Sequence, residues 1–120
     1  MKYEYKPKSL IKEYENERFM KKKYGVLISE GMQKFLRYVE SAKDAYDIKS
    51  IPFFYMEHKV GNLSDHYAVS LDKKKSKWRL MIQMLDDNGN VMVPTDNEKE
   101  FLKSIYYIRI KELSEHYANY

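Results

Sequence analysis

The sequence contains no cysteine. This absence excludes disulfides, thiolate zinc sites and a cysteine nucleophile, and it is compatible with a reducing cytosol. No run of eighteen apolar residues occurs, so no membrane-spanning helix is expected. The opening segment MKYEYKPK is charged and has no apolar core, so it does not resemble a signal peptide. We therefore expect a soluble, cytoplasmic protein without a membrane partner.

Glycine and proline are also sparse, with four and three copies in 120 residues. A chain of this length buries roughly two-thirds of its unfolded surface, so one domain is expected over residues 1–120. The net charge of +4 and the sequence pI near 9.0 favour polyanionic partners. Twelve tyrosines and five phenylalanines exceed what such a core needs. Some aromatic rings are therefore expected at the surface, for stacking or for a protein interface.

Two helices are expected in the first third of the chain. Ser9 is a suitable N-cap for the first helix, and Gly25 would end it. From Val26 onward, apolar residues recur at helical spacing and form one stripe, as in a helix that packs on a core. The residues of this stripe are Ile28, Met32, Phe35, Leu36, Val39 and Ala42. A short glycine turn between the two segments predicts a helical hairpin.

After Ile51 the apolar residues alternate with period two, which predicts strands. Turn-forming residues at Gly61-Asn62 and at Asp86–Gly89 separate them. The expected fold class is α+β, with an N-terminal helical hairpin packed on a mostly antiparallel four- to five-stranded sheet whose other face is free. The expected segments are strands over Phe53–Val60, His66–Asp72, Lys77–Leu85 and Ile105–Leu113, a short apolar piece over Val91–Val93, and one or two helical turns over Asn97–Lys103.

A run of lysines joins two of these strands: Lys73, Lys74, Lys75 and Lys77. The run contains no glycine or asparagine for a two-residue turn, so a loop of three to five residues is expected. The lysines have two interpretations, a solvated loop tip or a nucleic-acid-binding site. If Trp78 points into the core, Arg79 must point away from it, on the side of Lys77. Such a cationic ridge suits a phosphate backbone, because each neutralised phosphate releases counterions.

Four phrases occur in a characteristic order along the chain: HKVG (His58–Gly61), YAVSL (Tyr67–Leu71), WRLMI (Trp78–Ile82), and IRIKEL leading into SEHY. In this order, the phrases resemble the RelE/ParE superfamily of bacterial toxins, and within it the HigB-like branch. The resemblance covers nearly the whole chain. Two features differ from that branch: the terminal triplet is Ser-Glu-His where the branch has Asp-Tyr-His, and DDNGN is inserted between the last strands.

The resemblance implies a RelE-like fold and a toxin of a type II toxin–antitoxin system. Such a toxin is an mRNA endoribonuclease, or mRNA interferase, that cuts codons in the ribosomal decoding site and inhibits translation. Its partners would be mRNA, ribosomal RNA and a helix-turn-helix HigA-like antitoxin, with operator DNA contacted only through the antitoxin complex. A fold alone does not define chemistry. The alternatives are a non-nuclease ParE-like gyrase inhibitor and an operator-binding co-repressor module.

RNA cleavage without a metal needs a base for the 2′-OH, positive charge at the phosphorus and an acid for the leaving 5′ oxygen. We expect no cofactor and no metal. A zinc site built from the three histidines lacks any ligand-spacing signature. The candidate proton carriers are His116, His58 and Glu115, the candidate phosphate stabilisers are Arg79 and Lys59, and Tyr117 is a candidate for base stacking or proton donation.

Each candidate also has a structural interpretation. His116 follows the last strand, where a surface histidine is the alternative to a catalytic one. Arg79 has a planar guanidinium that suits two phosphate oxygens, and its alternative is a cross-strand salt bridge to Glu112. His58 and Lys59 alternate along a strand, so they would both face RNA only if the strand is bulged or ends there, which Gly61 makes possible. The family phrase favours Lys59. A third histidine, His66, is expected to be a structural residue at a strand start.

Overall fold

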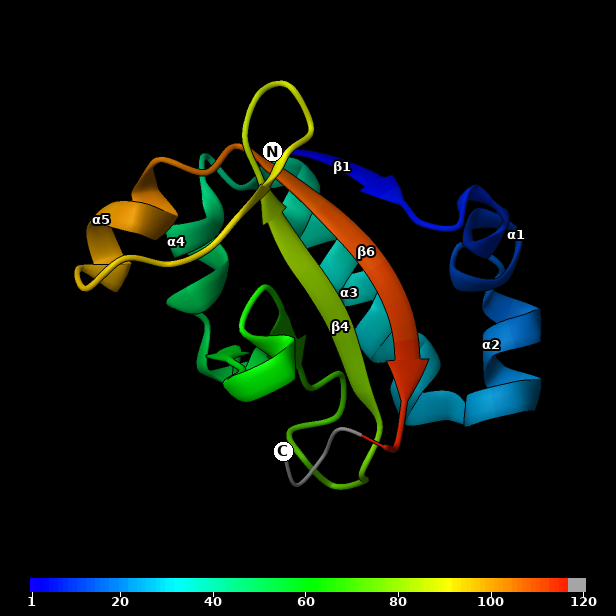
Figure 1. Cartoon of the computed structure of the whole chain (residues 1–120). Helices are drawn as coiled ribbons and strands as arrows, with labels where there is room; N and C mark the ends of the chain where they lie inside the picture. The colour runs from blue at the N-terminus through cyan, green and yellow to red at the C-terminus, as the bar shows by residue number, and fades with distance from the viewer. Residues whose placement is uncertain (117–120) are drawn as a thin grey trace.

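The computed structural model describes residues 1–116, and within them it is an α+β fold (Figure 1). The α-helices are α1 (Ile11–Tyr14), α2 (Glu17–Tyr24), α3 (Val26–Ser41), α4 (Ala45–Lys49) and α5 (Glu98–Lys103). Three 3-10 turns are η1 (Lys8–Leu10), η2 (Pro52–Phe54) and η3 (Gly61–Leu63). The strands are β1 (Lys2–Tyr5), β2 (Glu57–His58), β3 (Tyr67–Val69), β4 (Arg79–Leu85), β5 (Val91–Met92) and β6 (Tyr107–Ser114).

All six strands belong to one mixed sheet. Its order is β1-β6-β4-β3-β2, and β5 pairs with β4 beside this path. β1 is parallel to β6, whereas the other pairs are antiparallel. The prediction of four or five mostly antiparallel strands therefore missed one strand and the parallel pair. The missing strand is β1, which is only four residues long, and its charged sequence KYEY gives no strong apolar alternation.

The predicted helical hairpin is formed by α2 and α3, which pack against each other. Gly25, with a φ of 94°, ends α2 as expected, because this backbone conformation favours glycine. The expected N-cap at Ser9 was wrong. Ser9 lies inside η1, and the cap of α2 is Asn16, whose Oδ1 accepts from the backbone N of Phe19 at 3.0 Å.

The apolar stripe of α3 is buried as predicted. Ile28, Met32, Phe35 and Val39 are all in the hydrophobic core. Figure 1 shows α3 lying across one face of the sheet behind β4 and β6. Gly31 makes this close approach possible, because a Cβ at this position would lie 1.8 Å from the backbone oxygen of Leu71.

The first predicted strand, over residues 53–60, is largely absent. Its beginning forms the turn η2, with Pro52 in the first position of the turn, and only Glu57 and His58 pair in the sheet. Tyr55 has a φ of 43°, a left-handed conformation that interrupts an extended chain.

The C-terminal part of the chain follows the predicted order. The backbone N of Gly89 donates to the oxygen of Asp86 at 3.0 Å, which closes the expected turn. Beyond it, α5 begins after Asn97, whose Oδ1 accepts from the backbone N of Glu100. β6 then completes the sheet. None of the helices within residues 1–116 is long and apolar enough to cross a membrane.

The sheet face opposite α3 was expected to be free, and this expectation was wrong. On the central strand β4, only 2% of Met81, 4% of Gln83 and 8% of Arg79 is exposed. β4 is therefore buried on both faces along its whole length.

Candidate functional site

The sheet face opposite α3 carries the predicted catalytic arginine. Leu80 and Ile82 of β4 are in the core, and side chains alternate along a strand, so Arg79 and Met81 lie on the other face. Trp78 packs against the core from the neighbouring position. This confirms the prediction that Trp78 points toward the core and Arg79 points away from it.

His58 and Lys59 lie on different faces, as their alternation requires. Ala68 pairs with both Glu57 and Met81, which puts all three side chains on one face. Lys59 follows Glu57 by two residues and shares that face. Of the two candidates, Lys59 is the one on the face of the predicted catalytic arginine.

The imidazole of His58 is instead engaged on the side of the core. Its ring lies 5.2 Å from the ring of Tyr67, and its Nε2 lies 2.6 Å from the backbone oxygen of Ser64. A carbonyl oxygen only accepts hydrogen bonds, so Nε2 must carry the hydrogen. In the neutral ring, the basic nitrogen is then Nδ1.

Lys59 is only 2% exposed, and its Nζ lies 3.2 Å from Glu57 Oε1. Its backbone N donates to the oxygen of His66, which places it level with Gln83 in the sheet. Gln83 is four residues from Arg79 along β4, or about 13 Å at the usual strand rise. Lys59 therefore lies on the same face of the sheet as Arg79, but its backbone is at a different level along the strands.

Arg79 lies at the end of β4 next to the lysine run. Its Nη1 donates to the backbone oxygens of Ser76 and Trp78, both at 2.8 Å. These bonds tie the guanidinium to its own loop. A guanidinium has five N–H donors, and these two bonds account for two of them.

The C-terminal candidates meet Arg79 at this end of the sheet. Arg79 pairs with Ser114 across β4 and β6, and Glu115 and His116 follow directly. Both are exposed, and the backbone N of His116 donates to the Ser114 hydroxyl at 3.0 Å. Tyr117 lies outside the described residues. The structure thus brings Arg79 and the segment of His116 to one end of the sheet, whereas His58 faces the core and the backbone of Lys59 is level with Gln83.

A polar row that the sequence did not reveal crosses the same face farther along the strands. It consists of Glu4, Arg109, Gln83 and Asp65, which we call the polar row. Arg109 Nε donates to Glu4 at 3.0 Å and Nη1 to Gln83 at 3.4 Å, and Gln83 Nε2 donates to Asp65 at 3.2 Å. The row connects β1, β6, β4 and the segment before β3. His66 Nδ1 lies 2.7 Å from Asp65, which fits its expected structural role.

Glu4 is the acidic end of the polar row. The hydroxyl of Tyr107 donates to it, and this bond, helped by the bond and the charge of Arg109, lowers the pKa of the Glu4 carboxyl. The same bond raises the pKa of Tyr107. Gln83 and Arg109 lie in strands that the sequence predicts, so their polar side chains could be seen there. Their partner Glu4 could not be identified, because it lies in the unpredicted strand β1.

The lysine run forms a longer and more ordered connection than predicted. β3 ends at Val69 and β4 begins at Arg79, so the connection exceeds three to five residues. Lys73 and Lys74 have φ values of 56° and 61°, and the backbone N of Lys75 donates to the oxygen of Asp72 at 3.2 Å. Two positive φ values inside such a bond define a primed turn, even without glycine or asparagine. We call residues 72–75 the lysine turn.

Buried polar groups hold the lysine turn in this strained conformation. Ser70 and Asp72 are buried, and Ser70 Oγ accepts from the backbone N of Lys74 at 2.7 Å. Each left-handed lysine costs on the order of 1–3 kcal/mol. Within residues 1–116, the only other non-glycine residue with a positive φ is Tyr55, and Lys74 Nζ lies 5.2 Å from its ring. Backbone strain is therefore concentrated around the lysine turn.

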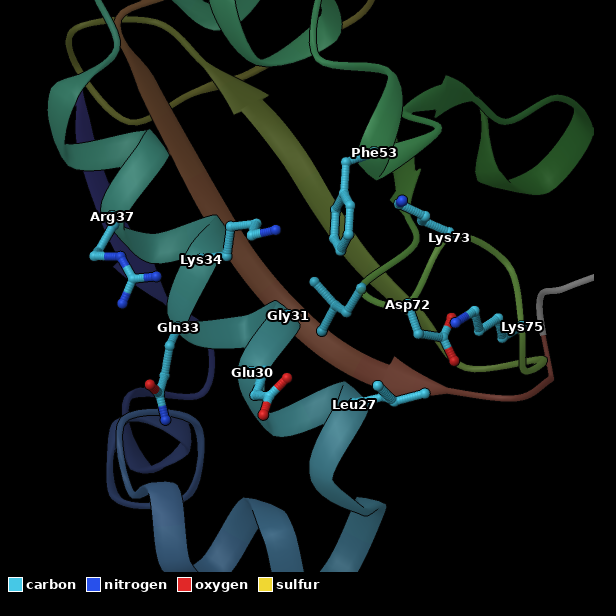
Figure 2. Close-up of a pocket in the computed structure, with 11 residues that line it drawn as sticks. Leu27, Glu30, Gly31, Gln33, Lys34, Arg37, Phe53, Asp72, Lys73 and Lys75 are labelled. Carbon is cyan, nitrogen blue, oxygen red and sulfur yellow. The ribbon is translucent and has the colours of Figure 1, made fainter.

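A pocket of about 290 Å³ lies between α3 and the lysine turn, and we call it the α3 pocket (Figure 2). Phe53 stands between two lysines in this view, with Lys34 Nζ 4.0 Å and Lys73 Nζ 5.6 Å from the centre of its ring. The pocket is lined by Leu27, Glu30, Gly31, Gln33, Lys34, Arg37, Phe53, Leu71, Asp72, Lys73 and Lys75. The sequence indicated its lysines but not the contribution of α3.

No group of three or more His, Cys, Asp or Glu side chains within the described part of the chain could hold a metal ion. No protein-family model matches the chain, and neither does any curated protein or solved structure. The functional argument therefore depends on the residues and their geometry.

Proposed function

We propose that the chain is a HigB-like toxin of the RelE/ParE superfamily, a ribosome-dependent mRNA endoribonuclease that inhibits translation. The observation that carries this proposal is the pairing of Arg79 with Ser114. This pairing brings the best candidate cation to the segment of His116, the best candidate proton carrier, at one end of the sheet. The two residues come from separate phrases of the family resemblance, WRLMI and SEHY.

In the proposed reaction, a base removes the proton of the RNA 2′-OH, and the 2′ oxygen attacks the adjacent phosphorus. The bond between phosphorus and the 5′ oxygen breaks, and an acid protonates the leaving oxygen. His116 is the proposed proton carrier, and such a group contributes on the order of 10² to 10⁴ in rate. Arg79 is the proposed donor to the developing negative charge, worth about 10² to 10³.

The proposed partners follow from the same resemblance. A helix-turn-helix HigA-like antitoxin neutralises the toxin, and operator DNA is bound only through their complex. The exposed Lys73, Lys74, Lys75 and Lys77 contact ribosomal RNA or mRNA. Each phosphate contact adds salt-dependent affinity.

The burial of the two cations favours a second candidate function. Arg79 is 8% exposed and bonded to loop carbonyls, and Lys59 is 2% exposed and bonded to Glu57. In the alternative function, these two cations stabilise the fold and do not contact a phosphate. On this basis, the alternative is a non-nuclease member of the same superfamily, either a ParE-like gyrase inhibitor or a co-repressor module.

Induction of the protein in bacteria, followed by mapping of transcript ends, separates the two functions. We expect growth arrest with codon-phased cuts, both lost in Arg79→Ala and His116→Ala and retained in Arg18→Ala, an exposed arginine on α2. Circular dichroism of each purified variant checks the fold. Fully toxic, folded Arg79→Ala and His116→Ala variants would refute the catalytic assignment. Intact mRNA with damaged DNA would establish gyrase inhibition instead.

A further inference from the structure

We propose that the α3 pocket binds a phosphate group of single-stranded RNA, at a site separate from the end of the sheet that holds Arg79 and His116. The inference deepens the proposed function, since it takes RNA as the substrate class. It adds residues of α3 and the ring of Phe53 to a nucleic-acid surface that the sequence had limited to the lysine run.

The charge of the α3 pocket favours an anion. Four of its lining side chains are basic and two are acidic, which gives a net charge of +2 (4 − 2). The basic residues come from both walls, with Lys34 and Arg37 on α3 and Lys73 and Lys75 on the lysine turn. One acidic group is already engaged, because the hydroxyl of Ser70 donates to Asp72 Oδ1 at 3.3 Å. Lys34 and Lys73 lie on either side of the ring of Phe53, so the centre of the pocket carries positive charge (Figure 2).

The size of the pocket restricts the ligand. Its volume of about 290 Å³ is at the lower limit of small-molecule sites, which span roughly 300–1,000 Å³. It suits one phosphate or one nucleotide, and a duplex would not enter.

The site is held in place before any ligand arrives. Phe53 attracts the ammonium groups of Lys34 and Lys73, at 4.0 and 5.6 Å from its ring centre. The lysine turn is fixed by the buried Ser70 hydroxyl, and Gly31 of α3 lies close to Leu71, the residue before the turn. A strained backbone that the surrounding structure maintains is a recurrent mark of ligand sites. Preorganised cations lose less entropy on binding.

An exposed aromatic ring beside the lysine turn favours RNA over an acidic protein segment. Half of Tyr55 is exposed, and Lys74 Nζ lies 5.2 Å from its ring. Single-stranded nucleic acids combine phosphate contacts with base stacking on such rings. A carboxylate-rich peptide would use the cations but has no base to stack.

Fluorescence anisotropy with a short, labelled, fully 2′-O-methylated single-stranded RNA tests the proposal. The modified RNA lacks the 2′-OH nucleophile, so binding is measured without cleavage. The variants are Lys34→Gln and Lys73→Asn, because asparagine tolerates a positive φ and preserves the turn. Lys12→Gln on α1 is the matched control for charge. Thermal unfolding of each variant checks the fold.

We expect each pocket variant to weaken binding about three- to tenfold and to reduce the slope of log K against log salt by about 0.7. Lys12→Gln should match the wild type, and an acidic peptide should compete poorly. Pocket variants that bind RNA like Lys12→Gln would overturn the site, as would equal competition by the peptide or undetectable RNA binding by the wild type. If induction of the wild-type protein left mRNA uncut in cells, only the proposed function would be refuted, because the anisotropy assay does not depend on cleavage.

Discussion

Replacement of Gly31 by alanine tests the close packing of α3 against Leu71, the residue before the lysine turn. An added Cβ would lie 1.8 Å from the carbonyl oxygen of Leu71 and 2.6 Å from its carbonyl carbon. Ordinary contact begins at 3.4 Å, so the oxygen would have to move by about 1.6 Å (3.4 − 1.8). Both atoms are backbone atoms, so no side-chain rotation relieves the clash.

The size of the effect follows from two opposing contributions. Overpacking costs about 1–3 kcal/mol, and the rigid backbone contact puts this position at the upper end. Alanine recovers about 1 kcal/mol because it favours the helix more than glycine does. Gly31→Ala should therefore lose about 2 kcal/mol of unfolding free energy. For a chain of this length, the melting temperature should fall by roughly 6–10 °C.

Urea unfolding followed by circular dichroism and by tryptophan fluorescence measures this loss. Trp78 is a useful reporter, since its ring packs edge-on against Tyr24 at 4.9 Å. Gly61→Ala is the control for backbone strain alone. Its φ is 64° and no atom lies within 4 Å of the added Cβ, so it should cost about 1–2 kcal/mol without any clash. A Gly31→Ala variant as stable as the wild type would refute the described approach of α3 to Leu71 and, with it, the shape of the α3 pocket.

Three further predictions concern the lysine turn and the titrating groups. Ser70→Ala removes the buried acceptor of the Lys74 amide and should cost about 1–3 kcal/mol in urea unfolding, whereas the exposed Ser41→Ala should be nearly neutral; equal losses would contradict the role of Ser70. The pKa of Glu4 is lowered, so its stabilising contribution is present at neutral pH and is lost as the pH falls below its ordinary value of 4.5 through the lower folded value. When the free energy of unfolding is measured from pH 7 to 3, Glu4→Gln should lose less stability on acidification than the exposed control Glu100→Gln. Parallel curves for the two variants would contradict this prediction. Burial raises the pKa of Tyr3 to about 12, so stability should decline as the pH rises above 10; Tyr3→Phe should reduce the decline in alkaline unfolding more than the exposed Tyr106→Phe, and identical declines would refute the assignment.

Much of the fold could be predicted from short-range patterns. The stripe of α3 repeats over several turns, which is long enough for helical periodicity to be unambiguous. The phase of β4 was equally clear, because Leu80, Ile82 and Met84 alternate with Arg79 and Gln83. Gly25 ended α2 as its backbone freedom suggests. These features depend only on neighbours within a few residues.

The candidate site was less predictable. The sequence indicated Arg79, His116 and the lysine run, but it gave no sign that Arg79 is buried or that Lys59 lies in a different row. The polar row was missed because its members come from strands far apart in the chain. The positive φ values in the lysine turn contradict the usual preference of such turns for glycine and asparagine.

The sequence by itself determined which side of each helix and strand is apolar, where α2 ends, and that cations gather next to Trp78. Only the tertiary structure decided which strands are neighbours, that Ser114 lies opposite Arg79, and that Glu4 lies beside Arg109. The physical reason is that periodicity records the direction of a side chain relative to its own backbone. Register between strands depends on the packing of the whole sheet, and a slip of one residue would turn every side chain of a strand to the opposite face.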